Sequence, residues 1–284
     1  MKRMFAYPYI VWMAIFIVAP LILVLYYSLT AADGSGGVYF TLEHYQRFFE
    51  GTYAGQPFFE RIYVSVMLRS IWLALLSTII SFIVGYPIAY IMAGKEYSNK
   101  SFLLFLFLVP MWMNFLLRTY AWLTILEQNG ILNTVLSFIG LPKVDLLYTD
   151  GAVVLGMVYN FLPFMILPIY TVLKKMDHSI IEAAQDLGAD SKTVFLRVVF
   201  PLSLPGVVSG VTMVFMPGVT TFIISNLLGG GQYILIGNLI EQQFLKVGDW
   251  HFGSAISVIL IILILMSMGV LAGVDKQEDG GALF

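Results

Sequence analysis

The stretch DHSIIEAAQDLGADSKTVFLRVVFPLSLPG, residues 177–206, differs from the sequence around it because it is polar and helix-forming. Ser179 followed three residues later by Glu182 is an S-x-x-E capping box, which predicts that a helix begins there. Four apolar residues then recur at the spacing of one helix face. They are Ile180, Ala183, Ala184 and Leu187. The stretch therefore predicts an amphipathic helix in an otherwise apolar chain.

A second helix is predicted directly after the first. Gly188 is placed to end the first helix, because glycine adopts the left-handed conformation at low cost. Asp190 or Ser191 is suited to cap the next helix, which we expect to run to about Phe200 and to meet the following apolar segment at Pro201. Residues 177–206 thus predict a helix, a glycine turn and a second helix.

The composition of the whole chain indicates a membrane protein. Of its 284 residues, 59% are hydrophobic and 11% are charged, and the mean hydropathy is +0.87, whereas an ordinary soluble domain is about a quarter charged. A net charge of -2 argues against nucleic acid as a partner, because phosphate binding needs clustered Lys and Arg. With no Cys, three scattered His and no nucleotide-binding or catalytic motif, we expect no enzyme activity, metal or cofactor in this chain.

Six apolar segments are long enough to cross a bilayer as helices. They are residues 5–29, 70–94, 102–126, 151–173, 204–228 and 252–274. Residues 233–244, after a glycine-rich break, are predicted to form a short interfacial or re-entrant piece. The predicted fold class is therefore an all-α polytopic membrane protein with six transmembrane helices.

The distribution of Lys and Arg predicts the orientation of the chain. Most of the loop Lys and Arg lie on the same side as the N-terminus, and positive loops remain in the cytoplasm. Both termini and the 177–206 loop are therefore predicted to be cytoplasmic. Arg69 and Arg118 lie within or beside spans, where they either extend to the outer headgroups or serve a gating or pathway role.

The exposed side of the first loop helix predicts a protein partner. Glu182 and Asp186 disfavour a helix lying on anionic lipid, which normally presents Lys and Arg, although a plain connector remains an alternative. We expect six residues to carry the contact that couples this chain to its energy source: Glu182, Ala183, Ala184, Asp186, Leu187 and Gly188.

The same loop resembles the EAA loop, EAA-x3-G-x9-I-x-L-P, of bacterial ABC importer permeases. Residues 182–184, Gly188 and 198–201 match it, with Val198 and Phe200 in place of the usual Ile and Leu. The resemblance implies a type I importer permease fold in the bacterial cell membrane and a coupling-helix role for the loop. It also implies three partners: a homodimeric ATPase that binds ATP and Mg, a second permease subunit and an extracytoplasmic binding protein.

Other stretches are similar to spermidine/putrescine permeases of the B type. They are residues 109–126, 129–133, 227–245 and 249–258. This resemblance implies a polyamine as substrate and a polyamine-binding protein as partner. Two alternatives remain, namely a stand-alone secondary transporter or channel, and an ABC importer permease for a different small solute. The implied organisation is a first helix and extracellular loop (1–64), a permease core (65–274) that includes the 177–206 loop, and a cytoplasmic tail (275–284).

A polyamine path would combine carboxylates for the ammonium groups with aromatic walls for the methylenes. Seven residues are candidates for the path or its gate: three carboxylates at the predicted outer ends of spans, one arginine at the same level, and three aromatic residues within reach of them. They are Arg118, Trp112, Tyr120, Tyr159, Glu127, Glu241 and Asp249.

Overall fold

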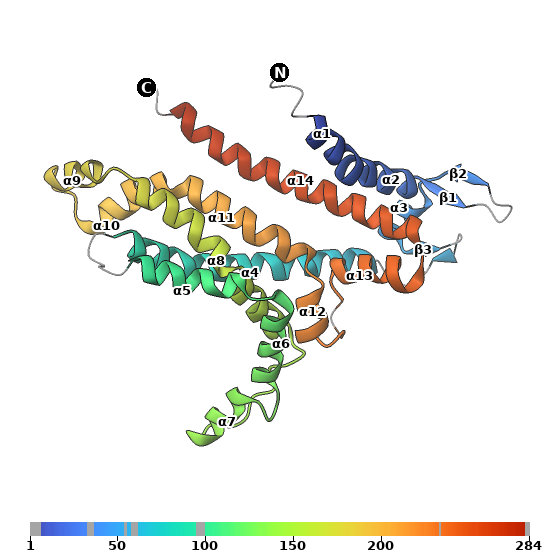
Figure 1. Cartoon of the computed structure of the whole chain (residues 1–284), viewed down its shortest axis with the longest axis horizontal. Helices are drawn as coiled ribbons and strands as arrows, with labels where there is room; N and C mark the ends of the chain where they lie inside the picture. Colours follow the sequence, from blue (N-terminus) through green and yellow to red (C-terminus); the bar gives the residue numbers. More distant parts are fainter. Residues whose placement is uncertain are drawn as a thin grey trace. The chain divides into compact units, whose positions relative to one another are not determined.

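The computed structural model describes residues 7–32, 37–53, 56–57, 62–94, 100–232 and 234–281. The chain, drawn in Figure 1, divides into two compact units. Unit 1 comprises Met1–Leu68 with Ile236–Met266, and unit 2 comprises Arg69–Leu235 with Ser267–Phe284. Two long helices, α4 (Ile62–Ala93) and α14 (Trp250–Gly281), have residues in both units.

Unit 1 holds the N-terminal helix and a set of short elements. In chain order these are α1 (Tyr7–Met13), η2 (Ala14–Val18), α2 (Ala19–Ser28), β1 (Thr30–Ala32), β2 (Val38–Phe40), α3 (Glu43–Glu50), β3 (Thr52–Tyr53), β4 (Gln56–Pro57), α13 (Ile236–Gln242) and η4 (Gln243–Val247), followed by most of α14. The strands form two antiparallel pairs, β1 with β2 and β3 with β4.

Unit 2 is a helical bundle built around α8. Its elements are α4, α5 (Lys100–Trp112), α6 (Phe115–Leu126), α7 (Ile131–Phe138), α8 (Asp150–Lys175), α9 (His178–Asp186), α10 (Ser191–Val194), η3 (Phe195–Val199), α11 (Phe200–Thr220) and α12 (Ile223–Leu228). A Cβ at Gly210 of α11 would lie 2.9 Å from Sδ of Met165 in α8. The two helices therefore approach closely because α11 has glycine at their contact.

Five stretches of helix are long and apolar enough to cross a membrane. They are Pro8–Ser28, Ile62–Ala93, Asp150–Lys175, Ser191–Thr220 and Trp250–Val270. Each of these overlaps one of the six predicted segments, and the mostly helical fold confirms the predicted class. The last helix continues to Gly281, into the predicted tail.

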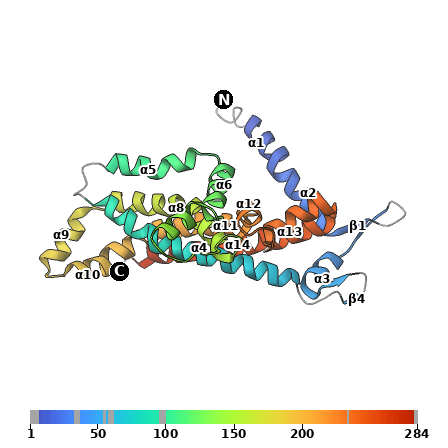
Figure 2. The same ribbon diagram turned by 90° about the horizontal axis from the view of Figure 1, so that it is seen from below.

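The prediction of one continuous helix over 102–126 is wrong. This segment consists of α5 and α6, and the chain turns sharply between them (Figure 2). The Asn114 side chain accepts a hydrogen bond from the backbone N–H of Leu116 at 2.8 Å and caps α6. An Asn that satisfies free N–H groups in this way favours a new helix start over continuation.

The prediction of a fifth helix over 204–228 is also wrong at both ends. The helix is continuous from Ser191 to Thr220 and then breaks, and α12 begins at Ile223. The predicted short piece after the glycine-rich break is present as α13 and η4.

Prolines account for two of the three wide, π-helical turns in the described residues. In η2 and η3 the turn ends two residues before Pro20 and Pro201 respectively. Proline lacks an N–H and clashes with the carbonyl four residues earlier, and a wider turn moves that carbonyl away. Accordingly, the N–H of Phe200 donates to the carbonyl of Phe195, five residues back.

Candidate functional site

The helix α9 begins two residues earlier than the sequence pattern predicts. Asp177 is its N-cap, and the carboxylate accepts a hydrogen bond from the backbone N–H of Ser179 at 3.0 Å. This bond holds the pKa of Asp177 below its usual value. The predicted capping box with Ser179 as the cap is therefore wrong, because the helix already includes His178 and Ser179.

The end of α9 agrees with the prediction. Gly188 has φ of 86°, its N–H donates to the carbonyl of Gln185, and the N–H of Ala189 donates to that of Ala184. These two bonds form the Schellman motif, which requires the left-handed conformation.

The next helix also begins where one of the two predicted caps lies. Asp190 accepts a hydrogen bond from the backbone N–H of Thr193 and so caps α10. Hydrogen bonding to Thr193 lowers the pKa of Asp190. The two short helices are thus fixed at three of their ends by polar caps and a glycine turn.

The apolar residues of α9 lie on two different faces. Ile181 and Ala184 pack against the core of unit 2, whereas Ile180 is 44% exposed and Leu187 is 89% exposed. Ala183 is exposed between them. The predicted single apolar face is therefore wrong, because the bundle contacts the row that contains residue 181. We call Ile180, Ala183 and Leu187 the α9 ridge.

The charged candidates of the loop lie beside this ridge. Glu182 and Asp186 are both exposed on α9. An apolar ridge flanked by carboxylates, on a helix with fixed ends, has the form of a docking surface for another protein.

The loop is connected to two membrane helices by an aromatic cluster. The ring of Tyr86 in α4 lies 5.9 Å from that of Phe195 and 5.6 Å from that of Phe200. The Tyr86 hydroxyl is hydrogen-bonded to Oγ of Ser203 in α11 at 2.8 Å, where both residues are buried. The end of the loop therefore packs against both α4 and α11. Behind α9, a cavity of about 600 Å³ is lined by Tyr90, Met176, Ile181 and their neighbours.

Two of the path candidates lie together in unit 2. Arg118 is 7% exposed, and its Nε and Nη1 have no hydrogen-bond partner among the described residues. Trp122, one helical turn after Arg118, brings Tyr159 of α8 close to this part of α6. The ring of Tyr159 packs edge-on against Trp122 at 5.3 Å. Arg118 is thus buried between helices of its own chain.

Three further candidates of unit 2 are exposed. Trp112 is at the end of α5, Tyr120 is on the exposed side of α6, and Glu127 is the C-cap of α6. Their exposure is compatible with a surface that faces a path, and no contact in the described residues brings them together.

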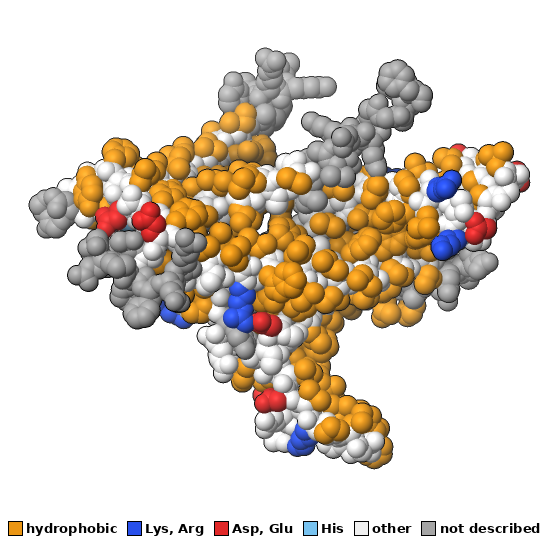
Figure 3. All heavy atoms as spheres, turned by 180° about the vertical axis from the view of Figure 1, so that it is seen from behind, with side chains coloured by type: hydrophobic (Ala, Val, Ile, Leu, Met, Phe, Trp, Pro, Cys, Tyr) orange, Lys and Arg blue, Asp and Glu red, His pale blue; other side chains and the backbone are white. Residues whose placement is uncertain are grey.

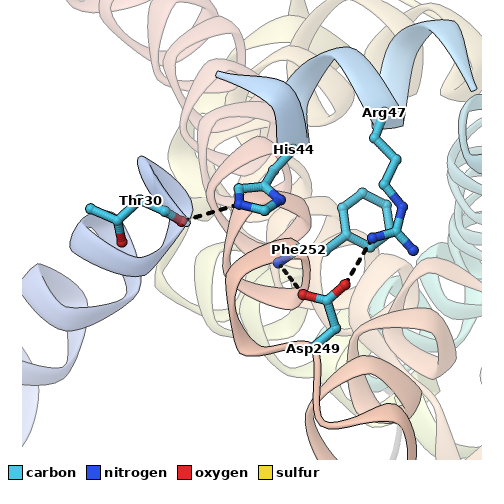
Figure 4. Close-up of polar contacts among 5 residues, drawn as sticks. All are labelled: Thr30, His44, Arg47, Asp249 and Phe252. Carbon is cyan, nitrogen blue, oxygen red and sulfur yellow. Dashed lines mark hydrogen bonds and ion pairs between the residues drawn. The ribbon is translucent and has the colours of Figure 1, made fainter. Parts of the chain in front are cut away.

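The two remaining candidates belong to unit 1. One carboxylate oxygen of Asp249 accepts a hydrogen bond from Arg47 at 2.8 Å, and the other caps α14 by accepting from the N–H of Phe252 at 3.0 Å (Figure 4). The Arg47 guanidinium also lies 3.9 Å from the centre of the Phe252 ring. Asp249 therefore fastens α3 to the start of α14. Glu241 is partly exposed in α13.

Some features of the site gave no clear signal in the sequence. The ion pair between Arg69 and Asp150, at 2.8 Å, joins residues 81 positions apart. The breaks at residues 113–114 and 221–222 interrupt two predicted spans, and irregular backbone at membrane depth is found where it lines a cavity.

No group of three or more His, Cys, Asp or Glu suited to a metal ion occurs in the described residues.

A bundle of helices long and apolar enough to cross a membrane, with a pair of short, capped, exposed helices between two of them, defines a polytopic membrane protein. The chain matches the family described as "Binding-protein-dependent transport system inner membrane component" over residues 62–276, and it belongs to that family.

Named relatives cover nearly the whole chain. The chain is 36% identical over 256 residues to the spermidine/putrescine transport system permease protein PotB of Escherichia coli (strain K12), covering 89% of this chain and 90% of the relative. It is 37% identical over 269 residues to PotB of Haemophilus influenzae, covering 93% and 91%.

Solved structures share the fold at lower identity. A bacterial ABC transporter involved in the import of the acidic polysaccharide alginate has a chain with a TM-score of 0.77, 16% identity and coverage of 95% of this chain and 93% of its own. The MetNI methionine ABC transporter gives a TM-score of 0.52 at 17% identity, covering 77% and 99%.

Proposed function

We propose that this chain is one of two permease subunits of an ABC importer that carries polyamines, spermidine or putrescine, across the bacterial cell membrane. The observation that carries the proposal is the likeness to PotB proteins, at 36–37% identity over about nine tenths of the chain. The α9 ridge on a chain without a nucleotide-binding motif supports it, because such a permease takes its energy from another subunit.

A separate homodimeric ATPase, which binds ATP and Mg, docks on the α9 ridge in this proposal. When the ATPase closes, it displaces α9 and α10, and the aromatic cluster around Tyr86 transmits the displacement to α4 and α11. Both chain termini and the 177–206 loop face the cytoplasm, and an extracytoplasmic binding protein delivers the substrate on the other side. The second permease supplies the other half of the path.

The path in this chain lies at the two broken spans. One interrupted span consists of α5 and α6, and the other consists of α11 and α12. The two short helices, α6 and α12, pack against each other. Interrupted helices absorb a change in direction more readily than continuous ones. Arg118 and Tyr159, near this region, are the candidates for the gate.

Proteoliposomes distinguish this function from that of a stand-alone carrier or channel. Uptake of labelled spermidine is expected only when the second permease, the ATPase, internal ATP and the binding protein are all present. Uptake by this chain alone, driven by an ion gradient, would reject the proposal. Uptake by the full complex of another small solute, but not of a polyamine, would retain the subunit role and reject the substrate.

A further inference from the structure

An apolar groove of about 660 Å³ lies in unit 2 between α4, α6 and α8. Its walls are side chains of α4 between Trp72 and Ile80, side chains of α8 between Val154 and Leu162, and Trp122 of α6. Asp150, at one end, is the only lining residue that carries a charge. Figure 3 shows hydrophobic side chains over much of one face of the molecule.

The length of the groove matches one leaflet of a bilayer. From Asp150 to Leu162 the helix rises about 18 Å, at about 1.5 Å per residue, and half of a hydrocarbon core is roughly 15 Å thick. Both α4 and α8 are candidate membrane spans, and Asp150 is the first residue of α8. The groove therefore begins at a helix end, where headgroups lie, and extends into the hydrocarbon region.

The mouth of the groove presents two opposite charges side by side. Nη2 of Arg69 lies 2.8 Å from both carboxylate oxygens of Asp150, and the two side chains are 37% and 44% exposed. Arg69 precedes Trp72 by one helical turn. A phosphate accepts hydrogen bonds from a guanidinium, and a primary ammonium donates to a carboxylate. A headgroup that carries both groups complements this pair.

We propose that the groove holds one acyl chain of a phospholipid with a phosphate and a primary ammonium in its headgroup, such as phosphatidylethanolamine, and that Arg69 and Asp150 bind this headgroup. A choline headgroup has no N–H to donate to Asp150, and a glycerol headgroup has no positive charge. A polyamine suits the groove less well, because Asp150 is already neutralised by Arg69, and Arg118 adds a positive charge one turn from Trp122 on α6.

Photolabelling tests the proposal on the assembled transporter in nanodiscs. A phosphatidylethanolamine with a diazirine on its acyl chain is expected to label peptides that contain residues 72–80 or 154–162. Unlabelled lipids with identical chains then compete, and phosphatidylethanolamine is expected to displace the probe at roughly two- to fivefold lower concentration than phosphatidylglycerol or phosphatidylcholine, as for a partly exposed ion pair. Equal competition by the three lipids, or no label in these peptides, would overturn the proposal.

Variants separate the headgroup site from the groove. Asp150→Asn and Arg69→Gln are each expected to remove the preference for phosphatidylethanolamine, while Val158→Trp, which fills the groove, removes the label itself. The exchanged pair, Arg69→Asp with Asp150→Arg, is expected to keep the preference. Lys143 is exposed and bonded to Asn129, so Lys143→Gln serves as the control variant, which is expected to label and compete like the wild type. A preference for phosphatidylethanolamine that persists in Asp150→Asn contradicts the headgroup site.

A helix of the second permease is the competing occupant. If Val158→Cys forms a cross-link to that subunit in the assembled transporter and the lipid probe does not label the groove, the proposal is wrong. Substrate uptake by the wild-type complex is a separate measurement, so the lipid site and the proposed function fail independently.

Discussion

At the scale of single residues, the loop that we propose to couple this chain to an ATPase depends on one glycine and one leucine. Gly188 has a left-handed backbone that lets α9 end, and Leu187, directly before it, is almost fully exposed. Neither residue stabilises the core of unit 2, so their substitution separates a coupling role from a folding role.

Replacement of Leu187 by Asp is expected to abolish copurification of the ATPase and to leave the folding of the permease unchanged. The side chain is 89% exposed, so its removal costs little folding energy, whereas a charge in an apolar contact costs at least about 2 kcal/mol. Pull-down of the ATPase and thermal unfolding of the permease measure the two effects. Leu187→Met is the conservative control. Normal pull-down with Leu187→Asp means that the ridge is not the docking surface.

Replacement of Gly188 by Val or Ala is expected to reduce uptake more than replacement by Asn. A left-handed residue other than glycine costs about 1–2 kcal/mol, and Asn tolerates this region best. Nothing lies within 4 Å of a Cβ at this position, so the effect arises from the backbone conformation and not from a clash. Uptake rates measured for the three variants show whether Asn retains more transport than Ala and Val. An order that follows side-chain size, with Asn no better than Ala, contradicts this explanation.

At the scale of elements, the wide turn η3 joins the coupling loop to α11, and Pro201 accounts for it. Pro201→Ala restores an N–H and removes the clash with the carbonyl of Arg197, so residues 195–199 are expected to adopt regular α-helical turns. That change rotates α9 and α10 relative to α11 by roughly 100°, which is one residue of an α-helix.

The rate of ATP-driven uptake is therefore expected to fall by at least about tenfold in Pro201→Ala, which corresponds to about 1.4 kcal/mol. The thermal stability of the complex is expected to be retained or to increase. ATP-driven uptake and the unfolding temperature of the assembled complex are the measurements. Leu202→Ala, at the exposed neighbouring position, is the matched control. Unchanged uptake in Pro201→Ala would show that the wide turn has no part in coupling.

The elements also show what could be predicted from the sequence. Hydropathy locates five of the membrane helices, because about 20 apolar residues in a row have few other stable arrangements, but it misplaces some of their ends by eight residues or more. Gly188 and Asp190 are recognisable because their effects are local. The sequence pattern at Ser179 and Glu182 was misleading, since Asp177 caps the same helix end two residues earlier. The face of α9 that contacts the bundle depends on packing with distant helices, which a local pattern does not contain.

Breaks and long-range pairs were harder to predict for a related reason. Asn114 interrupts an otherwise uniform apolar run, and its effect depends on whether its side chain caps a new helix or points elsewhere. Arg69 and Asp150 are far apart in the chain and meet only after α4 and α8 have packed.

At the scale of the whole molecule, family membership and the relatives at about 36% identity define a permease subunit. Solved ABC importers at 16–17% identity share its fold. The proposed substrate and the proposed partners form one account, in which an extracytoplasmic binding protein delivers a polyamine and an ATPase on the opposite side drives its passage. That account makes ATP hydrolysis depend on the loaded binding protein.

The most direct test is the ATPase rate of the reconstituted complex with the binding protein added from outside, first without ligand and then saturated with spermidine. The account predicts that the spermidine-loaded protein stimulates hydrolysis at least about tenfold and that Leu187→Asp abolishes the stimulation, a difference of at least about 1.4 kcal/mol in the barrier. Stimulation only by a sugar or an oxyanion, or equal hydrolysis with Leu187→Asp, would contradict it.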